Sequence, residues 1–130
     1  SDTSGSITVK DNTVCIAAAA FHGCSNIISI TLPDSVSYVC GSAFSNCTSL
    51  ASITIGKGVL SIENWAFNGC TSLNYIKCLA TSNISIGLMG SSNVGWLAGV
   101  SDNGTFVKAA GSEWSTGSRG IPTNWTIEEV

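Results

Sequence analysis

Residues 43–55 read AFSNCTSLASITI, and residues 66–78 read AFNGCTSLNYIKC. The two stretches lie 23 residues apart and share the same residue at seven of their thirteen positions. A third copy, AFHGCSNIISITL, occupies residues 20–32, so the pattern recurs without an insertion. Such a regular period predicts a repeat protein in which every copy folds in the same way.

Two apolar columns extend the same 23-residue step, namely Ile7, Ile30, Ile53 and Ile76, and then Val9, Leu32, Ile55 and Cys78. A period of this length is too short for a helix pair and suits a solenoid coil with one strand. Alternation along residues 52–55 turns Ile53 and Ile55 inward and Ser52 and Thr54 outward. We therefore expect parallel, stacked strands at residues 6–9, 29–32, 52–55 and 75–78.

The remainder of each coil must return along the convex side. Val36 and Val39, and then Val59 and Ile62, have the spacing of residues that point into the core. The Ala-Phe pairs that begin at Ala43 and at Ala66 are expected in a turn of helix or 3₁₀-helix. The phenylalanines of these turns form the bulkiest column of the core, comprising Phe21, Phe44 and Phe67.

These patterns predict an α/β repeat solenoid, a short leucine-rich-repeat stack of 23-residue coils with a parallel concave β-sheet and a few short helical turns. We expect the repeats in residues 1–78, as a partial first coil followed by coils near 10–32, 33–55 and 56–78. Residues 79–130 are expected to form an irregular C-terminal capping region of the same domain. Within that region, 105–108 and 125–127 are predicted strands and 111–124 a long loop.

The stretches AFSNCTSL at residues 43–50 and AFNGCTSL at residues 66–73 resemble BspA-type leucine-rich repeats, and this resemblance covers residues 4–78. The segments 96–100, 104–108 and 120–126 are similar to the C-terminal ends of such proteins from gut Bacteroidetes. The resemblance implies a secreted or surface-anchored protein that serves adhesion or binding and has no catalytic apparatus.

We therefore expect a non-enzymatic binding or adhesion module, extracellular or at the cell surface, whose own sequence shows no signal peptide or anchor. Its partner would be a host or bacterial surface protein or a glycan. The alternative is a structural spacer or assembly element without a ligand of its own. The chain is expected to be a monomer or to associate weakly through its N-terminal strand edge.

The composition excludes several partners. Charged residues make up only 10% of the chain, and the net charge is −3. Nucleic acids and anionic membranes are bound by clustered Lys and Arg, so neither is an expected partner. No apolar run approaches the roughly 20 residues of a membrane-spanning helix, so no membrane insertion of this segment is expected.

The outward strand positions supply the candidate binding residues, which are Ser29, Ser52 and Tyr75 in one column and Thr31, Thr54 and Lys77 in the next. Solenoids commonly bind on this face. A tyrosine beside hydroxyl groups can stack on a sugar or contact a peptide. The competing interpretation is that serine and threonine are simply suited to a solvated strand.

The six cysteines are interpreted chiefly as buried free thiols, because Cys24, Cys47 and Cys70 share one repeat column. Among possible disulfides, Cys15 and Cys40 on neighbouring coils form the best-placed pair. The chain has no Cys-x-x-Cys and a single histidine, so neither a metal nor a cofactor is expected.

His22 is expected to be exposed and idle, because polar residues occupy its equivalent positions in the other coils. Without a second base, no catalytic group of nucleophile, base and stabiliser is expected. The tryptophans are interpreted as a cap over the open end of the core, with a carbohydrate platform as the alternative: Trp65, Trp96, Trp114 and Trp125.

Overall fold

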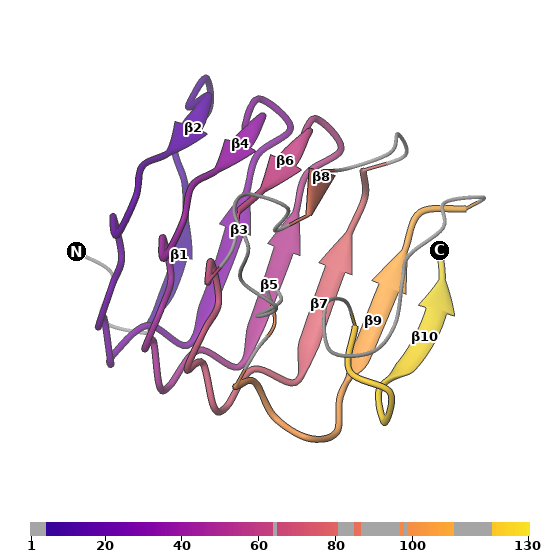
Figure 1. The fold of residues 1–130 in the computed structure, drawn as a ribbon. Helices are drawn as coiled ribbons and strands as arrows, with labels where there is room; N and C mark the ends of the chain where they lie inside the picture. The colour runs from indigo at the N-terminus through magenta and orange to yellow at the C-terminus, as the bar shows by residue number, and fades with distance from the viewer. Residues whose placement is uncertain (1–4, 64, 81–84, 87–96, 98, 111–120) are drawn as a thin grey trace.

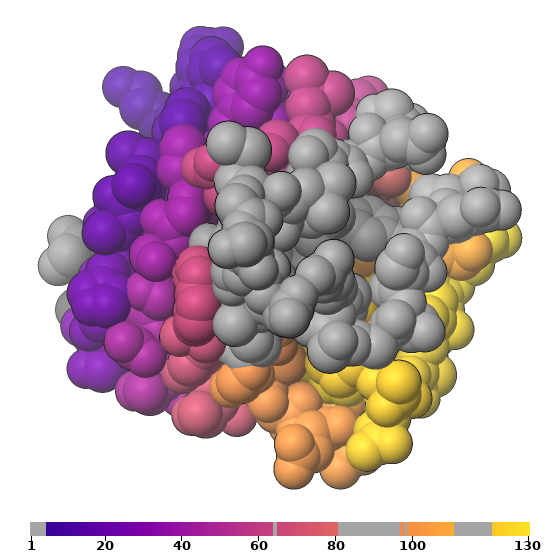
Figure 2. All heavy atoms as spheres, viewed as in Figure 1, coloured from indigo at the N-terminus to yellow at the C-terminus, as the bar shows by residue number. Residues whose placement is uncertain are grey.

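The chain winds into a solenoid whose coils stack side by side, and its first and last described residues lie at opposite ends of the stack (Figure 1). The computed structural model of the 130-residue chain describes residues 5–63, 65–80, 85–86, 97, 99–110 and 121–130. Figure 2 shows the successive coils as neighbouring bands of colour that run from indigo to yellow across the molecule.

One side of the solenoid is a six-stranded sheet in the order β1-β3-β5-β7-β9-β10. Its strands are β1 (Ser6–Thr8), β3 (Ser29–Leu32), β5 (Ser52–Ile55), β7 (Tyr75–Cys78), β9 (Thr105–Lys108) and β10 (Thr126–Glu129). All neighbours are parallel, and the register pairs Ile7 with Ile30, Ile30 with Ile53 and Ile53 with Ile76. The predicted stack of parallel strands and the column of isoleucines are confirmed.

A second parallel sheet, which the sequence pattern did not reveal, forms another side of each coil. It has the order β2-β4-β6-β8, with β2 (Cys15–Ile16), β4 (Tyr38–Val39), β6 (Ser61–Ile62) and β8 (Ser85–Ile86). Ile16, Val39 and Ile62 lie in register and are buried. These short strands are the convex return segments whose apolar residues were expected to point into the core.

The third side of the coil is a turn rather than the predicted helix or 3₁₀-helix, and the described residues contain no helix. The α/β label is therefore corrected to an all-β solenoid. Along residues 43–47, alternate amides bond locally: those of Ala43, Ser45 and Cys47 donate to carbonyls three residues earlier. The intervening amides of Phe44 and Asn46 donate to the next coil, at 2.8 Å and 2.7 Å.

Backbone conformation explains why this turn cannot continue as a helix. Ser42 and Asn46 both have positive φ, 60° and 57°, which lies outside the right-handed helical region. The equivalent positions in the other coils are also left-handed, namely Ala19, Trp65, Gly23 and Gly69. Two left-handed residues per turn prevent a helix from forming, and they direct every second amide toward the neighbouring coil.

The core lies between the three sides and is built from matching columns of apolar side chains. Its largest members are the stacked rings of Phe21, Phe44 and Phe67, with successive centroids 5.2 Å apart and the planes within 6° of parallel. Phe44 and Phe67 are fully buried, whereas Phe21, in the first coil, is partly exposed. Each buried ring therefore fills space between its own coil and the next.

The six-stranded sheet continues beyond the last 23-residue coil. The steps from Tyr75 to Thr105 and from Thr105 to Thr126 are 30 and 21 residues, yet β9 and β10 stay parallel and in register. The two strands predicted near 105–108 and 125–127 are thus present. The division between repeats and cap at residue 78 stays a prediction, and residues 111–120 of the expected loop lie outside the described residues.

Replacing Phe44 by alanine is expected to lower the free energy of unfolding by about 3–5 kcal/mol, because the change opens a cavity between two rings. Phe21→Ala provides the matched control and should cost roughly half as much, since Phe21 is partly exposed and stacks on one ring. Urea denaturation of the two variants and the wild type measures both values. A loss below about 1 kcal/mol for Phe44→Ala would contradict the stacked core.

Candidate functional site

The candidate site lies on the outer face of the six-stranded sheet. The register places Ser29, Ser52 and Tyr75 in one column and Thr31, Thr54 and Lys77 in the adjacent one. We call these six residues the outer strip. All six side chains are exposed or half-buried, whereas the residues that alternate with them along each strand are buried. The sheet thus presents the predicted residues on one surface.

The character of the outer strip changes at β7. β3 and β5 contribute only hydroxyl groups, while β7 adds the phenol of Tyr75 and the ammonium of Lys77. Tyr75 is 39% exposed, and Thr105 on β9 lies beside it. Val107, the β9 neighbour of Lys77, is buried although it occupies an outward column. The β7 end of the strip therefore combines an aromatic ring, a cation and an apolar neighbour.

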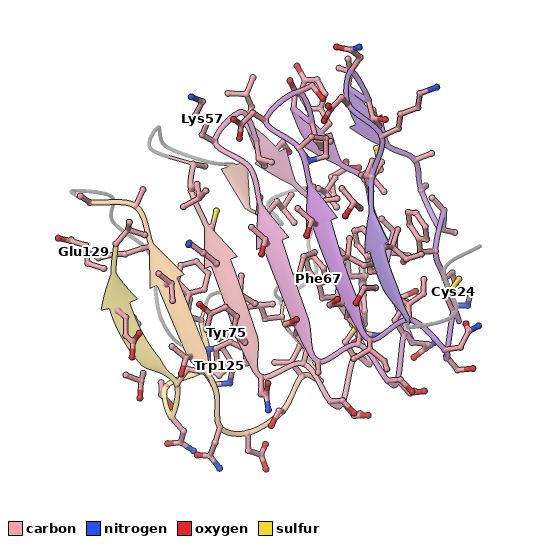
Figure 3. The ribbon with its side chains drawn as sticks, turned by 180° about the vertical axis from the view of Figure 1, so that it is seen from behind. Cys24, Lys57, Phe67, Tyr75, Trp125 and Glu129 are labelled. Atoms are coloured by element: carbon pink, nitrogen blue, oxygen red, sulfur yellow. The ribbon has the colours of Figure 1, made fainter. Side chains whose placement is uncertain are left out.

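Trp125 packs in the hydrophobic core at this end of the sheet. It is buried, and its indole Nε1 donates to the Ser101 carbonyl oxygen at 2.8 Å. Its ring lies so close to Gly104 that a Cβ there would approach a ring carbon to 2.6 Å. Figure 3 places Trp125 and Tyr75 at the same end of the sheet. This burial agrees with a capping role for Trp125.

Trp65 lies on the turn side of the coil, away from the outer strip. It is 39% exposed and has a φ of 68°, which is unusual for a bulky residue. Ala19 and Ser42 adopt the same conformation at the equivalent positions, so the strain belongs to the repeat and marks no special site. Trp96 and Trp114 lie outside the described residues.

The cysteine column next to the phenylalanine stack fills core space. Cys47 and Cys70 are fully buried, and their thiols donate to the carbonyl oxygens of Phe21 and Phe44, each at 3.0 Å. The neighbouring Cys47 thiol and burial together raise the pKa of Cys70. Burial raises the pKa of Cys24, which is partly exposed in the first coil.

His22 is exposed, as expected, and its side chain contacts the next coil. Its Nδ1 lies 2.5 Å from Oγ of Ser45, which is buried in the next coil. The Ser45 hydroxyl also lies within hydrogen-bond distance of the Ser42 carbonyl oxygen, at 3.1 Å. The contact between His22 and Ser45 therefore joins two neighbouring coils.

The described parts of the chain hold no cluster of three or more metal-binding side chains. Within the same residues, no helix has the length and apolar character needed to cross a membrane. The outer strip itself offers four hydroxyl groups, one phenol ring and one ammonium group.

Comparison with protein families gives a match to the BspA type leucine rich repeat region (6 copies), over residues 2–93. The chain belongs to this family. Comparisons with curated proteins and with solved structures found no match. Leucine-rich repeats of this kind are typically non-catalytic, and membership indicates a protein-interaction module.

Unfolding should become easier at alkaline pH because of Cys78. Burial raises the pKa of its thiol from the ordinary 9.0 to about 11, so the unfolded chain loses this proton first. Its contribution to stability is complete below pH 9 and is lost as the pH rises toward 11. Between pH 8 and 11, the wild type should lose about 2 kcal/mol more than Cys78→Ala. Denaturant titrations at several pH values measure this difference, and equal losses would contradict the assignment.

Proposed function

We propose that this chain is a non-enzymatic binding or adhesion module that contacts its partner through the outer strip. The observation that carries the proposal is the register: two columns of hydroxyl side chains on β3 and β5 lie directly beside Tyr75 and Lys77 on β7. Solenoids of stacked coils commonly use such a surface for binding. The proposed partner is a host or bacterial surface protein or a glycan.

The chemistry of the outer strip supports a polar partner. Ser29, Thr31, Ser52 and Thr54 can both donate and accept hydrogen bonds, which matches sugar hydroxyls and the backbone of an extended peptide. Tyr75 offers a flat apolar ring with a polar tip, the kind of group that is enriched at interfaces. Lys77 adds one positive charge on a chain that carries a net charge of −3.

The size of the surface sets the expected strength of binding. Parallel strands lie about 4.8 Å apart, so β3, β5 and β7 together span roughly 10–15 Å. A strip of this width offers an area well below the approximately 800 Å² that each partner buries in a standard interface. We therefore expect weak binding by a single copy, strengthened where several copies engage one surface.

The proposed location is the cell surface or the exterior of the cell, where proteins of this family are usually found. Two features of the chain support this location. The thiols of Cys47, Cys70 and Cys78 are buried, which shields them from oxidation. The low fraction of charged residues and the many hydroxyl groups suit contact with glycans and surface proteins.

Binding should depend on Tyr75 and Lys77 and not on the same residue types elsewhere. The double variant Tyr75→Ala/Lys77→Ala is expected to reduce capture by about tenfold or more, because it removes the ring and the charge from the strip. The matched control is Tyr38→Ala/Lys57→Ala, which changes an exposed tyrosine on the second sheet and an exposed lysine in a turn. Glycan arrays and immobilised extracellular matrix proteins are the probes.

Thermal melts of both double variants should match that of the wild type, which separates lost contact from lost folding. Equal capture by the two double variants would contradict the outer strip as the binding surface. If, in addition, the mass measured by sedimentation rose with protein concentration, the chain would be an assembly element rather than a binding module.

A further inference from the structure

Two cysteines outside the repeated cysteine column lie next to each other across the first two coils. The Sγ atoms of Cys15 and Cys40 are 3.4 Å apart. Cys15 begins β2, and the backbone amide of Cys40 donates to the carbonyl oxygen of Ile16 at 2.9 Å. The backbone thus fixes the second thiol beside the strand that carries the first.

The repeat does not account for this pair. The positions equivalent to Cys15 are Tyr38 and Ser61, as the strand register shows. Those equivalent to Cys40 by the 23-residue step are Ala17 and Glu63. The two cysteines therefore occupy different columns, each in one coil only, and are brought together by a diagonal contact. Cys24, Cys47 and Cys70, in contrast, recur at one position because every coil has the same space to fill.

The two thiols differ in accessibility and in their surroundings. Cys15 is exposed, while Cys40 is half-buried. The side chain of Glu63 lies on the other side of Cys40, where its Oε1 accepts the Gly41 amide at 3.0 Å. The hydrogen bond to Cys15, burial and the charge of Glu63 together raise the pKa of Cys40 to about 11. Cys40 thus keeps its proton at neutral pH, and Cys15 is the thiol that meets solvent.

We propose that Cys15 and Cys40 form a reversible redox pair that closes to a disulfide by exchange with a low-molecular-weight disulfide of the glutathione class. The Cys15 thiolate attacks one sulfur of the oxidant and releases the first thiolate. Cys40 then loses its proton and attacks the Cys15 sulfur, which releases the second thiolate. Two protein thiols are oxidised by two electrons, and one oxidant disulfide is reduced to two thiols.

Little movement is needed to form this bond. A disulfide has an S–S distance of about 2.05 Å, so the sulfur atoms must approach by roughly 1.4 Å, which side-chain rotation can supply. The bond would tie the first coil to the second. Residues 17–20 of the first coil are exposed, and Phe21 is only partly buried, so this coil has less support from packing than the two coils that follow it. The disulfide therefore ties a weakly packed end of the described stack to the better-packed coil beside it.

The test uses the full chain, first reduced and then equilibrated with oxidised and reduced glutathione. After the remaining thiols are alkylated, chymotrypsin cleavage after Phe21, Tyr38 and Phe44 places Cys15, Cys24, Cys40 and Cys47 in separate peptides. Mass spectrometry should find one cross-link, between the peptides of Cys15 and Cys40. The oxidised chain should melt about 5–10 °C higher than the reduced chain, and dithiothreitol should reverse the shift.

Three serine variants distinguish the members of the pair. Cys24→Ser is the matched control, and it should form the cross-link as the wild type does. Cys40→Ser should accumulate a glutathione adduct on Cys15, because the resolving thiol is missing. Cys15→Ser should form no cross-link, and its melting temperature should not change on oxidation. All three substitutions change side chains that are exposed or half-buried, so the folded state is retained.

Three results would overturn the proposal. The first is a cross-link that joins other cysteines, such as Cys24 and Cys47. The second is a wild type that takes up glutathione on Cys15 without closing the bond. The third is a cross-linked chain with an unchanged or lower melting temperature, which would show that the bond does not fasten the first coil. Because the peptide map is read on the wild type, the first two results do not depend on how the variants fold.

Discussion

The structure depends on one constraint: among the described 23-residue coils, the backbone of one coil bonds to the next coil on all three sides. Both sheets are ladders between coils, and the turn side supplies a third ladder through the amides of Phe21, Phe44 and Asn46. Buried backbone groups without partners are costly, so a coil that returned out of register would lose several bonds at once. The regular 23-residue step follows from this requirement.

The same constraint positions the core and the surface. Equal coils place like residues above one another, so the phenylalanine rings stack inside and the hydroxyl groups line up outside. Where the step lengthens to 30 residues, β9 still finds its register beside β7, and Tyr75 gains Thr105 as a neighbour. The backbone ladder thus tolerates a longer connection while the strand itself stays in place. Both the outer strip and the pair of Cys15 and Cys40 are products of coil-to-coil stacking.

Most of the six-stranded sheet and the inward columns could be predicted, because alternation and the 23-residue step are visible in the residue types themselves. The second sheet could not, since strands of two residues such as Tyr38–Val39 are too short to show a period. The prediction of a turn of helix or 3₁₀-helix at Ala43 and Phe44 is wrong. The left-handed conformations at Ala19, Ser42 and Trp65 cannot be predicted from these residue types. They prevent the turn from forming a helix. The outer strip was predicted by alternation, but the burial of Val107 beside it depends on packing that only the folded chain reveals.

Amide hydrogen exchange resolved by NMR tests the three-sided ladder most directly. Phe44 and Asn46 lie in a turn, where a sequence-based interpretation would expect rapid exchange. We expect the amides of Phe44 and Asn46 to be protected about as strongly as that of Ile53 in the central strand β5, because both donate to the next coil. Exchange at the rate of an unstructured chain for Phe44 and Asn46, with Ile53 still protected, would show that the turn side forms no ladder between coils.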